Sequence, residues 1–185
     1  MKNKMLLPVL AATFALSACA GAVGFVTEDR DFSGSVKDTK SEVTLKGDML
    51  QKDISLPIDV GVLVADGRAL TFGYVDSEEE IDSALAIIRK NPHITKVYNH
   101  LSLRPQGNII DSVEDSYYTQ KLWAKLVATK GVKTANYKIK VYDRIAYVLG
   151  STTSAGERAK VEKIIDNTDG IKGKVFEVIL IDRGE

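Results

Sequence analysis

Apolar positions in the first half of the chain switch between a helical and a strand-like spacing. Leu45, Met49 and Leu50 recur at the period of an amphipathic helix and are expected on its inner face. The short apolar runs "VGVLV" and "ALTFGY" then predict two strands, followed by another helix and another strand. The order is therefore αββαβ, with helices expected at about 41–52 and 78–90 and the last strand at about 94–103.

The second half of the chain repeats this order. Leu122, Leu126 and Val127 have the spacing of a helix's inner face, and the runs "YKIKV" and "IAYVLG" predict the next two strands. When the second half is aligned with the first without a gap, many identities fall together, such as Asp66 with Asp143 and Gly73 with Gly150. The remaining elements are expected at about 115–129, 155–167 and 174–181.

Turn and capping signals support two copies of one module. The turn "ADGR" contains Asp-Gly, a strong hairpin signal, and "YDRI" occupies its place in the second copy. Each second helix opens with the S-x-x-E spacing of a capping box, in which the Ser oxygen accepts a backbone N–H and the Glu reaches back to the cap. These pairs are Ser77 with Glu80 and Ser154 with Glu157.

The connections between elements predict the fold class. A helix between the second and third strands allows these strands to pair in parallel, beside the antiparallel hairpin. We therefore expect an α+β fold with two tandem modules, each a small mixed three-stranded sheet packed against two helices. The modules are expected at residues 41–105 and 115–182. The linker, residues 106–114, is short, so contact between the modules is favoured over a loosely coupled pair.

The N-terminal segment has the pattern of a lipoprotein signal peptide. Lys2 and Lys4 precede an apolar run that is shorter than the roughly 20 residues of a membrane-spanning helix. The following "LSAC" matches the bacterial lipobox at all four positions, with the only cysteine of the chain, Cys19, at its end. This match implies cleavage after residues 1–18 and a covalent diacylglycerol and N-acyl lipid on Cys19. The alternative is an ordinary secreted protein with an unused thiol.

The residues after the lipobox suggest where the protein is held. Residues 19–40 mix Gly, Ser and charge without periodicity, which is typical of a tether between lipid and folded body. Ala20 stands at the sorting position after the cysteine. Because an Asp there commonly retains lipoproteins on the inner membrane, Ala20 favours the periplasmic face of the outer membrane.

These features together resemble those of a known family. Besides the lipobox and the duplicated αββαβ pattern, they include "DRDFSG" before the first module, "VYN" in its last strand and "DSYYTQKL" at the start of the second module. Gly73 and Gly150 at the ends of the second strands also fit. The sequence resembles the dual BON-domain outer-membrane lipoproteins, of the division- and outer-membrane-stress-associated lipid-binding type, over nearly its whole length.

The resemblance implies a non-enzymatic protein that contacts anionic phospholipids, such as phosphatidylglycerol and cardiolipin, through its second module and supports outer-membrane integrity. The charges agree with this expectation. The whole chain has a net charge of +0, yet residues 41–105 carry 7 basic and 10 acidic side chains, whereas residues 115–182 carry 12 basic and 8 acidic ones. A basic surface is attracted to anionic lipid.

The first helix of the second module is the expected site. At 100° per residue, Leu122, Leu126, Val127 and Trp123 share the side expected to face the core. The opposite side supplies most of the candidate phospholipid-binding residues, and Trp123 is a further candidate, since the resemblance implies a tryptophan near the start of this helix. The candidates are Tyr117, Tyr118, Lys121, Trp123, Lys125 and Ala128.

Plainer interpretations of these residues stay open. The lysines can also form a solvated helix face, and Tyr117 can pack between the modules. The helical angle of Trp123, next to Leu126 and Val127, favours the core or its edge over the membrane. The position matching the family's tryptophan is Tyr117, and Trp123 lies about two turns later, so the sequence departs from the family there.

Other chemistry is scarce, and it leaves three functional classes to compare. His93 and His100 lack the spacing of a metal site, and no P-loop, nucleophile elbow or dinucleotide fingerprint occurs. We therefore expect no metal, no cofactor, no nucleic-acid partner and no catalysis, which disfavours an envelope hydrolase. The alternative to lipid binding is an adaptor that docks an outer-membrane assembly protein or a cell-wall-associated partner.

Overall fold

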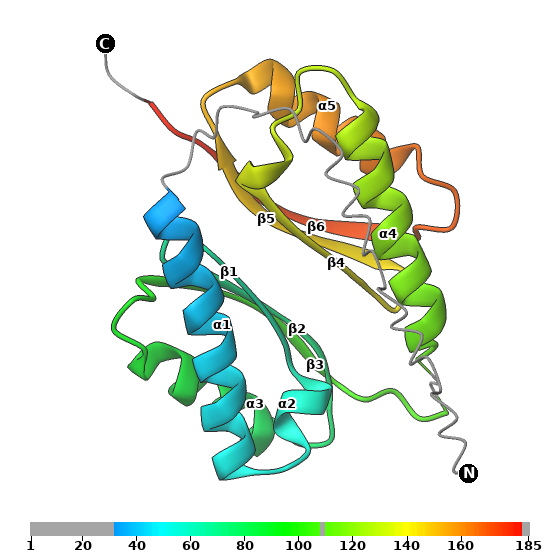
Figure 1. The fold of residues 1–185 in the computed structure, drawn as a ribbon. Helices are drawn as coiled ribbons and strands as arrows, with labels where there is room; N and C mark the ends of the chain where they lie inside the picture. The colour runs from blue at the N-terminus through cyan, green and yellow to red at the C-terminus, as the bar shows by residue number, and fades with distance from the viewer. Residues whose placement is uncertain (1–31, 108–109, 183–185) are drawn as a thin grey trace, which may run out of the picture.

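The computed structural model describes residues 32–107 and 110–182. Helices of the two modules form the outer layers, and two three-stranded sheets lie between them (Figure 1). The sheets face each other, so the layers follow the order helix, sheet, sheet, helix. The α+β class, the two modules and the mixed three-stranded sheets expected from the sequence are confirmed.

Module 1 has the order α1 (Phe32–Lys52), α2 (Leu56–Asp59), β1 (Gly61–Ala65), β2 (Arg68–Val75), α3 (Glu78–Lys90) and β3 (Lys96–Leu103). Strand β2 pairs antiparallel with β1 and parallel with β3, so β2 is central. The four-residue α2 was not anticipated, and α1 begins well before the expected start at residue 41. The bounds of α3 agree with the expected 78–90.

Module 2 has the order α4 (Ser112–Ala128), η1 (Thr134–Asn136), β4 (Tyr137–Tyr142), β5 (Ile145–Thr152), α5 (Ala155–Asp166) and β6 (Gly173–Leu180). Strands β5 and β6 begin and end at the positions that the gapless alignment makes equivalent to the ends of β2 and β3, and they pair in the same way. The repeat therefore has one fold in both copies, and the short 3-10 helix η1, which the sequence pattern also missed, occupies the place of α2.

Each module has its own core between its helices and one face of its sheet. In module 1, Leu45 and Met49 of α1 pack on Val64 of β1, and all three are almost fully buried. In module 2, Leu122 and Leu126 of α4 take the corresponding places on Val141 of β4. The expectation for Leu50 was wrong, because its side chain is 53% exposed on the outer face of α1.

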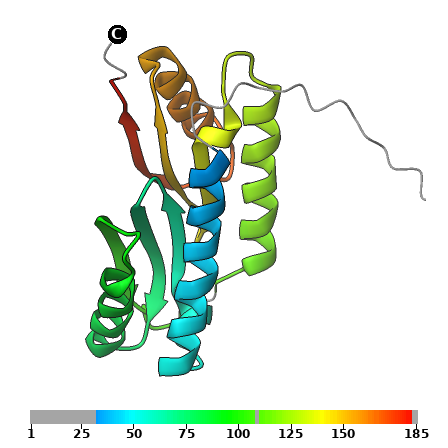
Figure 2. The ribbon, with the colours of Figure 1, turned by 60° about the vertical axis from the view of Figure 1, so that its left-hand side comes forward.

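A third apolar cluster joins the two modules through the other faces of their sheets. Leu70 and Phe72 of β2 meet Tyr147 and Leu149 of β5, and all four are buried. The rings of Phe72 and Tyr147 stack with centroids 4.6 Å apart. Figure 2 shows the two sheets from another side, with the first turns of α1 beside module 2. The modules thus touch, as the short linker predicts, and they share a core.

One charged side chain is enclosed in this contact. Arg68, 6% exposed, donates hydrogen bonds from module 1 to the carbonyl oxygens of Gly150 (2.8 Å) and Glu177 (3.3 Å) in module 2. Its guanidinium also lies 3.3 Å from the carboxylate of Asp66. The equivalent position in module 2 is Ile145, so this charged contact occurs on one side of the interface.

Both hairpin turns have their two central residues at positive φ, as hairpin geometry requires. These are Asp66 (51°) and Gly67 (70°) in module 1, and Asp143 (48°) and Arg144 (62°) in module 2. In module 2 the strained turn is held by the buried carboxylate of Asp115, which accepts from the backbone N–H groups of Asp143 (2.7 Å) and Arg144 (3.0 Å).

The predicted capping boxes form only in part. Ser77 and Ser154 cap α3 and α5 as expected, accepting from the backbone N–H groups of Glu80 and Glu157 at 3.2 Å. The reciprocal contacts differ. Glu80 accepts from the N–H of the residue before the cap, and Glu157 is buried and accepts from the N–H of Lys133 (2.7 Å) and the hydroxyl of Thr152. Glu157 therefore fastens the loop after α4 to α5.

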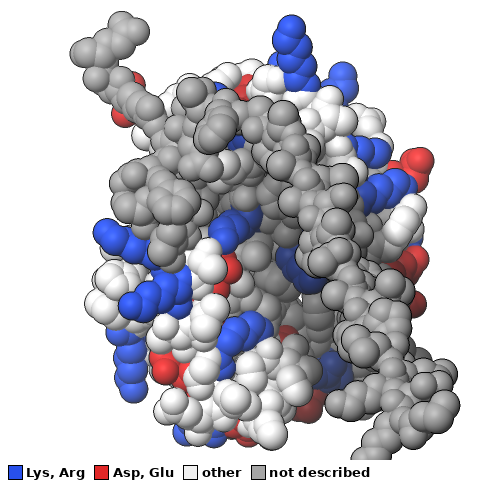
Figure 3. Space-filling view, in the orientation of Figure 1, with Lys and Arg blue, Asp and Glu red and all other residues white. Residues whose placement is uncertain are grey.

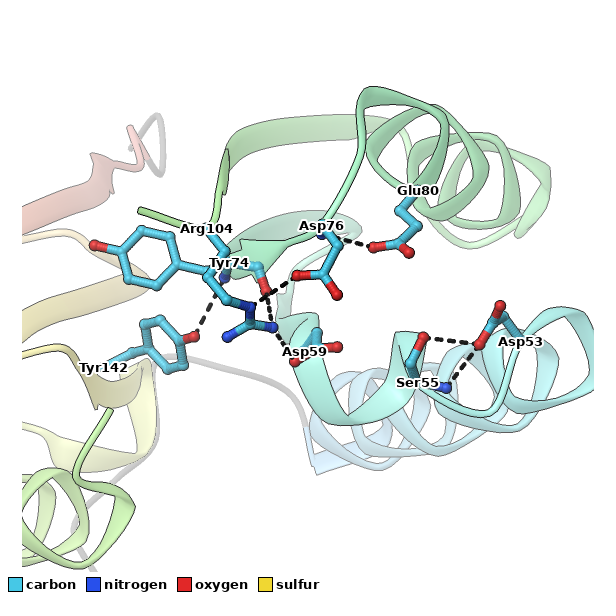
Figure 4. Close-up of polar contacts among 8 residues, drawn as sticks. All are labelled: Asp53, Ser55, Asp59, Tyr74, Asp76, Glu80, Arg104 and Tyr142. Carbon is cyan, nitrogen blue, oxygen red and sulfur yellow. Dashed lines mark hydrogen bonds and ion pairs between the residues drawn. The ribbon is translucent and has the colours of Figure 1, made fainter. Parts of the chain in front are cut away.

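The end of module 1 next to the linker is held by Arg104. Its guanidinium donates to Asp59 at 2.7 Å and to Asp76 at 2.8 Å, so it ties the end of α2 to the end of β2 (Figure 4). Two such ionic hydrogen bonds raise the pKa of Arg104. Beside them, the hydroxyl of Tyr142 in module 2 accepts from the backbone N–H of Tyr74, so this corner also touches the other module.

Candidate functional site

The orientation of α4 is set by its cap and its core side chains. The carboxylate of Asp111 accepts from the N–H groups of Val113 and Glu114 at 3.0 and 2.9 Å and starts the helix. Leu122 and Leu126 are fully buried against the sheet of module 2. The opposite side of α4 consequently points away from the module.

That outward side is mainly apolar, which is unusual for an exposed helix. At 100° per residue its members fall within about 100° of arc, and Val113, Tyr117 and Val127 are 80%, 58% and 69% exposed. The assignment of Val127 to the core was therefore wrong. We call this surface the α4 face, and it consists of the polar Gln120 and the apolar Val113, Tyr117, Ala124, Val127 and Ala128.

Two candidate lysines border the α4 face. Lys121 donates to the carbonyl oxygen of Asp169 at 3.0 Å, and Lys125 donates to the carbonyl oxygen of Asn167 (3.1 Å) and the hydroxyl of Thr168 (3.0 Å). Both ammonium groups thus lean from α4 toward the turn after α5. The oxygens that they contact are neutral, so the positive charge of both side chains is kept at this border.

A groove of about 460 Å³ opens between α4 and α5 beside these lysines. We call it the lysine groove. Lys125 contributes one wall, Lys160 and Lys163 of α5 contribute the other, and Ala128 and Ile164 give it apolar surface. Ala128 belongs to the α4 face as well, so the groove and the face are continuous. Figure 3 shows Lys and Arg side chains projecting at the upper margin of the molecule, where α5 lies in this orientation.

The acidic residues of α5 are engaged elsewhere. Lys174 of β6 pairs with Glu162 at 3.0 Å and with Asp166 at 2.7 Å. The hydrogen bond to Asp166 raises the pKa of Lys174. Because Lys174 balances one of these two carboxylates, the remaining negative charge offsets at most one of the three lysines that line the groove. The lysine groove therefore keeps an excess of positive charge.

Module 1 lacks the three lysines that line this groove. The residues equivalent to Lys125, Lys160 and Lys163 in the repeat are acidic, hydroxylic and aliphatic: Asp48, Ser83 and Ala86. Since the two modules share one fold, the difference is confined to side chains. A basic groove between the first and second long helices is a property of module 2.

The aromatic candidates divide between surface and core. Tyr117 is exposed, and the ammonium of Lys121 lies 5.9 Å from the centre of its ring. Tyr118 is half-buried under Arg144, whose guanidinium is 4.4 Å from the ring centre. Trp123 is half-buried and packs against the module 2 core. Of the three, Tyr117 therefore faces solvent on the α4 face, and the interpretation of Tyr117 as a module contact is not supported.

The two histidines of the chain are not placed to bind a ligand together. His100 lies 3.9 Å from Glu177 across the module contact, whereas His93 is exposed near the end of α3. Within residues 32–107 and 110–182, no three His, Cys, Asp or Glu side chains are arranged to hold a metal ion. In the same described ranges no helix combines the length and apolar character needed to cross a membrane. Cys19 lies outside the described residues.

Comparison with known proteins identifies the repeated module. The model of the BON domain matches residues 37–105 and again residues 114–173. The chain belongs to the BON domain family. The first match runs from within α1 to the end of module 1, and the second runs from the start of α4 to the first residue of β6, so the duplication seen in the sequence is a tandem pair of BON domains.

Individual relatives match most of the chain. The chain is 26% identical over 185 residues to the outer membrane lipoprotein DolP of Haemophilus influenzae, which covers 95% of this chain and 94% of that protein. It is 22% identical over 137 residues to the osmotically-inducible protein Y of Escherichia coli, covering 73% of this chain and 68% of that one. A solved structure of CdsD, from the type III secretion system of Chlamydia trachomatis, aligns with 13% identity and a TM-score of 0.33, over 75% of this chain and 92% of that one.

Proposed function

We propose that this BON-domain protein is a non-enzymatic lipoprotein held on the periplasmic face of the outer membrane, where module 2 binds anionic phospholipid and supports envelope integrity. The α4 face carries the proposal: it is an exposed apolar helix side bordered by lysines. Similarity to a protein named as an outer membrane lipoprotein, over 95% of this chain, supports the location.

The chemistry of the α4 face suits a membrane interface. The free energy falls when exposed valine and tyrosine side chains leave water and enter the boundary between headgroups and acyl chains. Lys121 and Lys125 would then lie at the depth of the phosphates, where each basic residue contributes about 1 kcal/mol of attraction to an anionic surface. Neither effect is large alone, so binding through this face is expected to be weak and sensitive to salt.

The proposed acyl anchor on Cys19 makes such weak binding effective. One acyl chain holds a protein only marginally, whereas two or three give stable attachment. The residues from Cys19 to the start of α1 can span at most about 45 Å, so the modules stay close to the membrane and the local lipid concentration is high. Mass spectrometry of the membrane-extracted protein should find Cys19 as the acylated N-terminus, and an unmodified thiol would contradict the anchor.

Vesicle binding tests the role of the α4 face. Residues 19–185 with Cys19→Ser should bind vesicles containing phosphatidylglycerol or cardiolipin, and bind phosphatidylcholine vesicles weakly. Replacing Lys121 and Lys125 together by glutamate should weaken binding about tenfold or more, because two attractions become repulsions. Thermal unfolding of the variant is recorded in parallel, since both lysines also bond the turn after α5.

The matched control reverses two charges on module 1. Lys37 and Lys40 are exposed on α1, nearly one helical turn apart, and their replacement by glutamate changes the net charge by the same amount. Binding should be affected much less in this control than in the α4 variant. Equal losses in the two variants would show that net charge alone drives binding, and an unchanged α4 variant would rule out the proposed face.

A protein-docking role has one observation in its favour. Module 1 also exposes apolar side chains, with Val43, Leu50, Ile54 and Ile58 between 53% and 79% exposed. Because this module is acidic, the patch is a poorer match for anionic lipid than for a protein. Recovery of a stoichiometric partner with the intact protein, lost on Leu50→Asp, together with no affinity of the unacylated chain for vesicles, would favour the adaptor over the lipid-binding role.

A further inference from the structure

We propose that the lysine groove is a discrete receptor for one anionic phospholipid molecule, with the phosphate between Lys125 and the lysines of α5. This inference rests on the proposed function and adds to it. The α4 face describes contact with a membrane surface, whereas the groove would select a single lipid by its phosphate and by part of its acyl chains.

The lysine groove has an excess of positive charge. Lys125 and Lys160 donate to neutral oxygens, the latter to the carbonyl of Lys130 at 3.3 Å, and Lys163 lines the groove with no carboxylate bound to it among the described residues. Glu162 and Asp166 of α5 both bind Lys174, so these groups together leave one negative charge against the three lysines. An anionic group entering the groove would therefore meet three ammonium groups without displacing a carboxylate. A phosphodiester fits this donor set.

The size and the apolar surface of the lysine groove also suit a lipid. A volume of about 460 Å³ lies within the range of small-molecule sites. Ile164 packs on the module core and offers its remaining surface to the groove, and Ala128 continues this apolar surface onto the α4 face. A ligand with a charged head and apolar chains would satisfy both ends of the groove at once. A bare phosphate would use only the lysines and leave the apolar surface in water.

The lysines of the groove are specific to the second copy of the repeat. Module 1 has the same helix pair but Asp48, Ser83 and Ala86 in place of the three lysines. A basic groove is thus not a requirement of the fold. The same comparison predicts that a lipid which binds module 2 in this way leaves the corresponding residues of module 1 unaffected.

A monomeric lipid separates the groove from the membrane surface. Residues 19–185 with Cys19→Ser are titrated with dihexanoyl phosphatidylglycerol below its micelle concentration and followed by methyl NMR. We expect saturable shifts at Ile164 and Ala128 with one lipid per protein. Glycerol phosphate, which lacks acyl chains, and dihexanoyl phosphatidylcholine, which lacks net charge, should both bind about tenfold more weakly or worse.

Charge-neutralising variants assign the site. Lys160→Gln with Lys163→Gln should weaken binding of the short-chain lipid about tenfold or more. The matched control, Lys140→Gln with Lys172→Gln, removes two exposed lysines of module 2 that do not line the groove and should bind normally. Equal binding in the groove variant and the wild type overturns the proposal, as does equal affinity for glycerol phosphate and the lipid.

The two proposals fail in different ways. If the wild type binds anionic vesicles but the short-chain lipid gives no saturable shift at the groove, the groove proposal is wrong and the α4 face stands. If anionic vesicles are not bound at all, the proposed function is wrong. A groove variant that loses the short-chain lipid and keeps most of its vesicle binding supports both proposals.

Discussion

The hydroxyl of Tyr74 in module 1 donates a 2.7 Å hydrogen bond to the carboxylate of Asp143 in module 2. The repeat makes Ser151 and Asp66 equivalent to this pair, and these residues form the reciprocal 2.6 Å bond from module 2 to module 1. Reciprocal contacts of this kind are the mark of a two-fold relation between equivalent surfaces. The two BON domains therefore pack like the subunits of a symmetric dimer, joined in one chain.

Removing the hydroxyl of Tyr74 should destabilise the pair of modules. Tyr74→Phe keeps the ring but leaves the turn carboxylate of Asp143 without this donor, and a hydrogen bond to a charged group contributes about 1.5 kcal/mol or more. We expect a loss of about 1–2 kcal/mol in the free energy of unfolding, measured by urea denaturation at pH 8. Tyr117→Phe, on the exposed α4 face, is the control and should change stability by less than about 0.5 kcal/mol.

The same bond predicts how stability depends on pH. The hydrogen bond from Tyr74 to Asp143 raises the pKa of Tyr74 to about 12, above the value of about 10 for an unfolded tyrosine. Between these values the unfolded chain releases the proton first, so the stability from Tyr74 is complete below about pH 10 and is lost as the pH rises toward 12. The difference in unfolding free energy between wild type and Tyr74→Phe should shrink over this range. Parallel curves would contradict the assignment.

Gly73 is required where β2 passes the end of α2. Its φ is +131°, and a Cβ added there would lie 2.0 Å from the carbonyl oxygen of Asp59. Gly73→Ala should therefore cost about 3–5 kcal/mol of unfolding free energy, combining backbone strain with a clash against main chain. Gly47→Ala is the matched control, because a Cβ on this exposed turn of α1 meets nothing within 4 Å and should stabilise the helix by about 0.5–1 kcal/mol. Similar effects at both positions would refute this explanation.

The buried carboxylate of Asp115 should contribute more to the free energy of unfolding than an acidic residue in the first turn of a helix usually does. Asp115→Ala leaves two turn N–H groups without an acceptor, which should cost about 2–4 kcal/mol in a chemical denaturation experiment. Asp111→Ala, which removes the exposed helix cap, should cost about 1 kcal/mol. An equal cost for the two substitutions would mean that water replaces Asp115 in the turn. Its repeat partner Asp38 accepts from the N–H of Asp66 and should behave in the same way.

The order of elements could be predicted because the sequence contains it twice. Strand alternation, the turn at Asp66 and the cap serines recur at one spacing, so each copy supports the assignment of the other. The ends of elements were predicted less well. The extra turns of α1 contain no strong apolar repeat, and Asp38, which fastens them to the hairpin, is buried because of a contact with the distant turn at Asp66.

The site could be predicted only in part. The period of α4 placed Lys121 and Lys125 on one side, yet Leu50 and Val127 were assigned inward because they follow a core residue directly. The buried side of a helix is inferred from the mean direction of its apolar side chains. Exposed apolar residues such as Leu50 and Val127 shift this direction, so it does not show accurately where the sheet lies. The lysine groove depends on α5, whose Lys160 is far from Lys125 in the sequence, and one helix's periodicity contains no information on that pairing.

Fluorescence can establish which side of α4 meets lipid, because Trp123 is the only tryptophan of the chain. Trp123 packs against the module core, whereas Tyr117 is exposed on the α4 face. Vesicles containing brominated phosphatidylglycerol should therefore quench Trp123 weakly in residues 19–185 with Cys19→Ser. In the variant Tyr117→Trp with Trp123→Phe, quenching should be strong, since the indole then lies among the exposed apolar side chains.

The comparison is informative because bromine quenches only at short range within the bilayer. Circular dichroism and thermal unfolding must show that the variant keeps the fold, since Trp123→Phe removes part of a half-buried ring. Strong quenching of Trp123 in the wild-type background, with weak quenching at position 117, would mean that the helix meets lipid through the side now assigned to the core edge. Strong quenching at position 117 alone would place the membrane against the surface that contains Val113 and Val127, because these residues share one side of α4 with Tyr117.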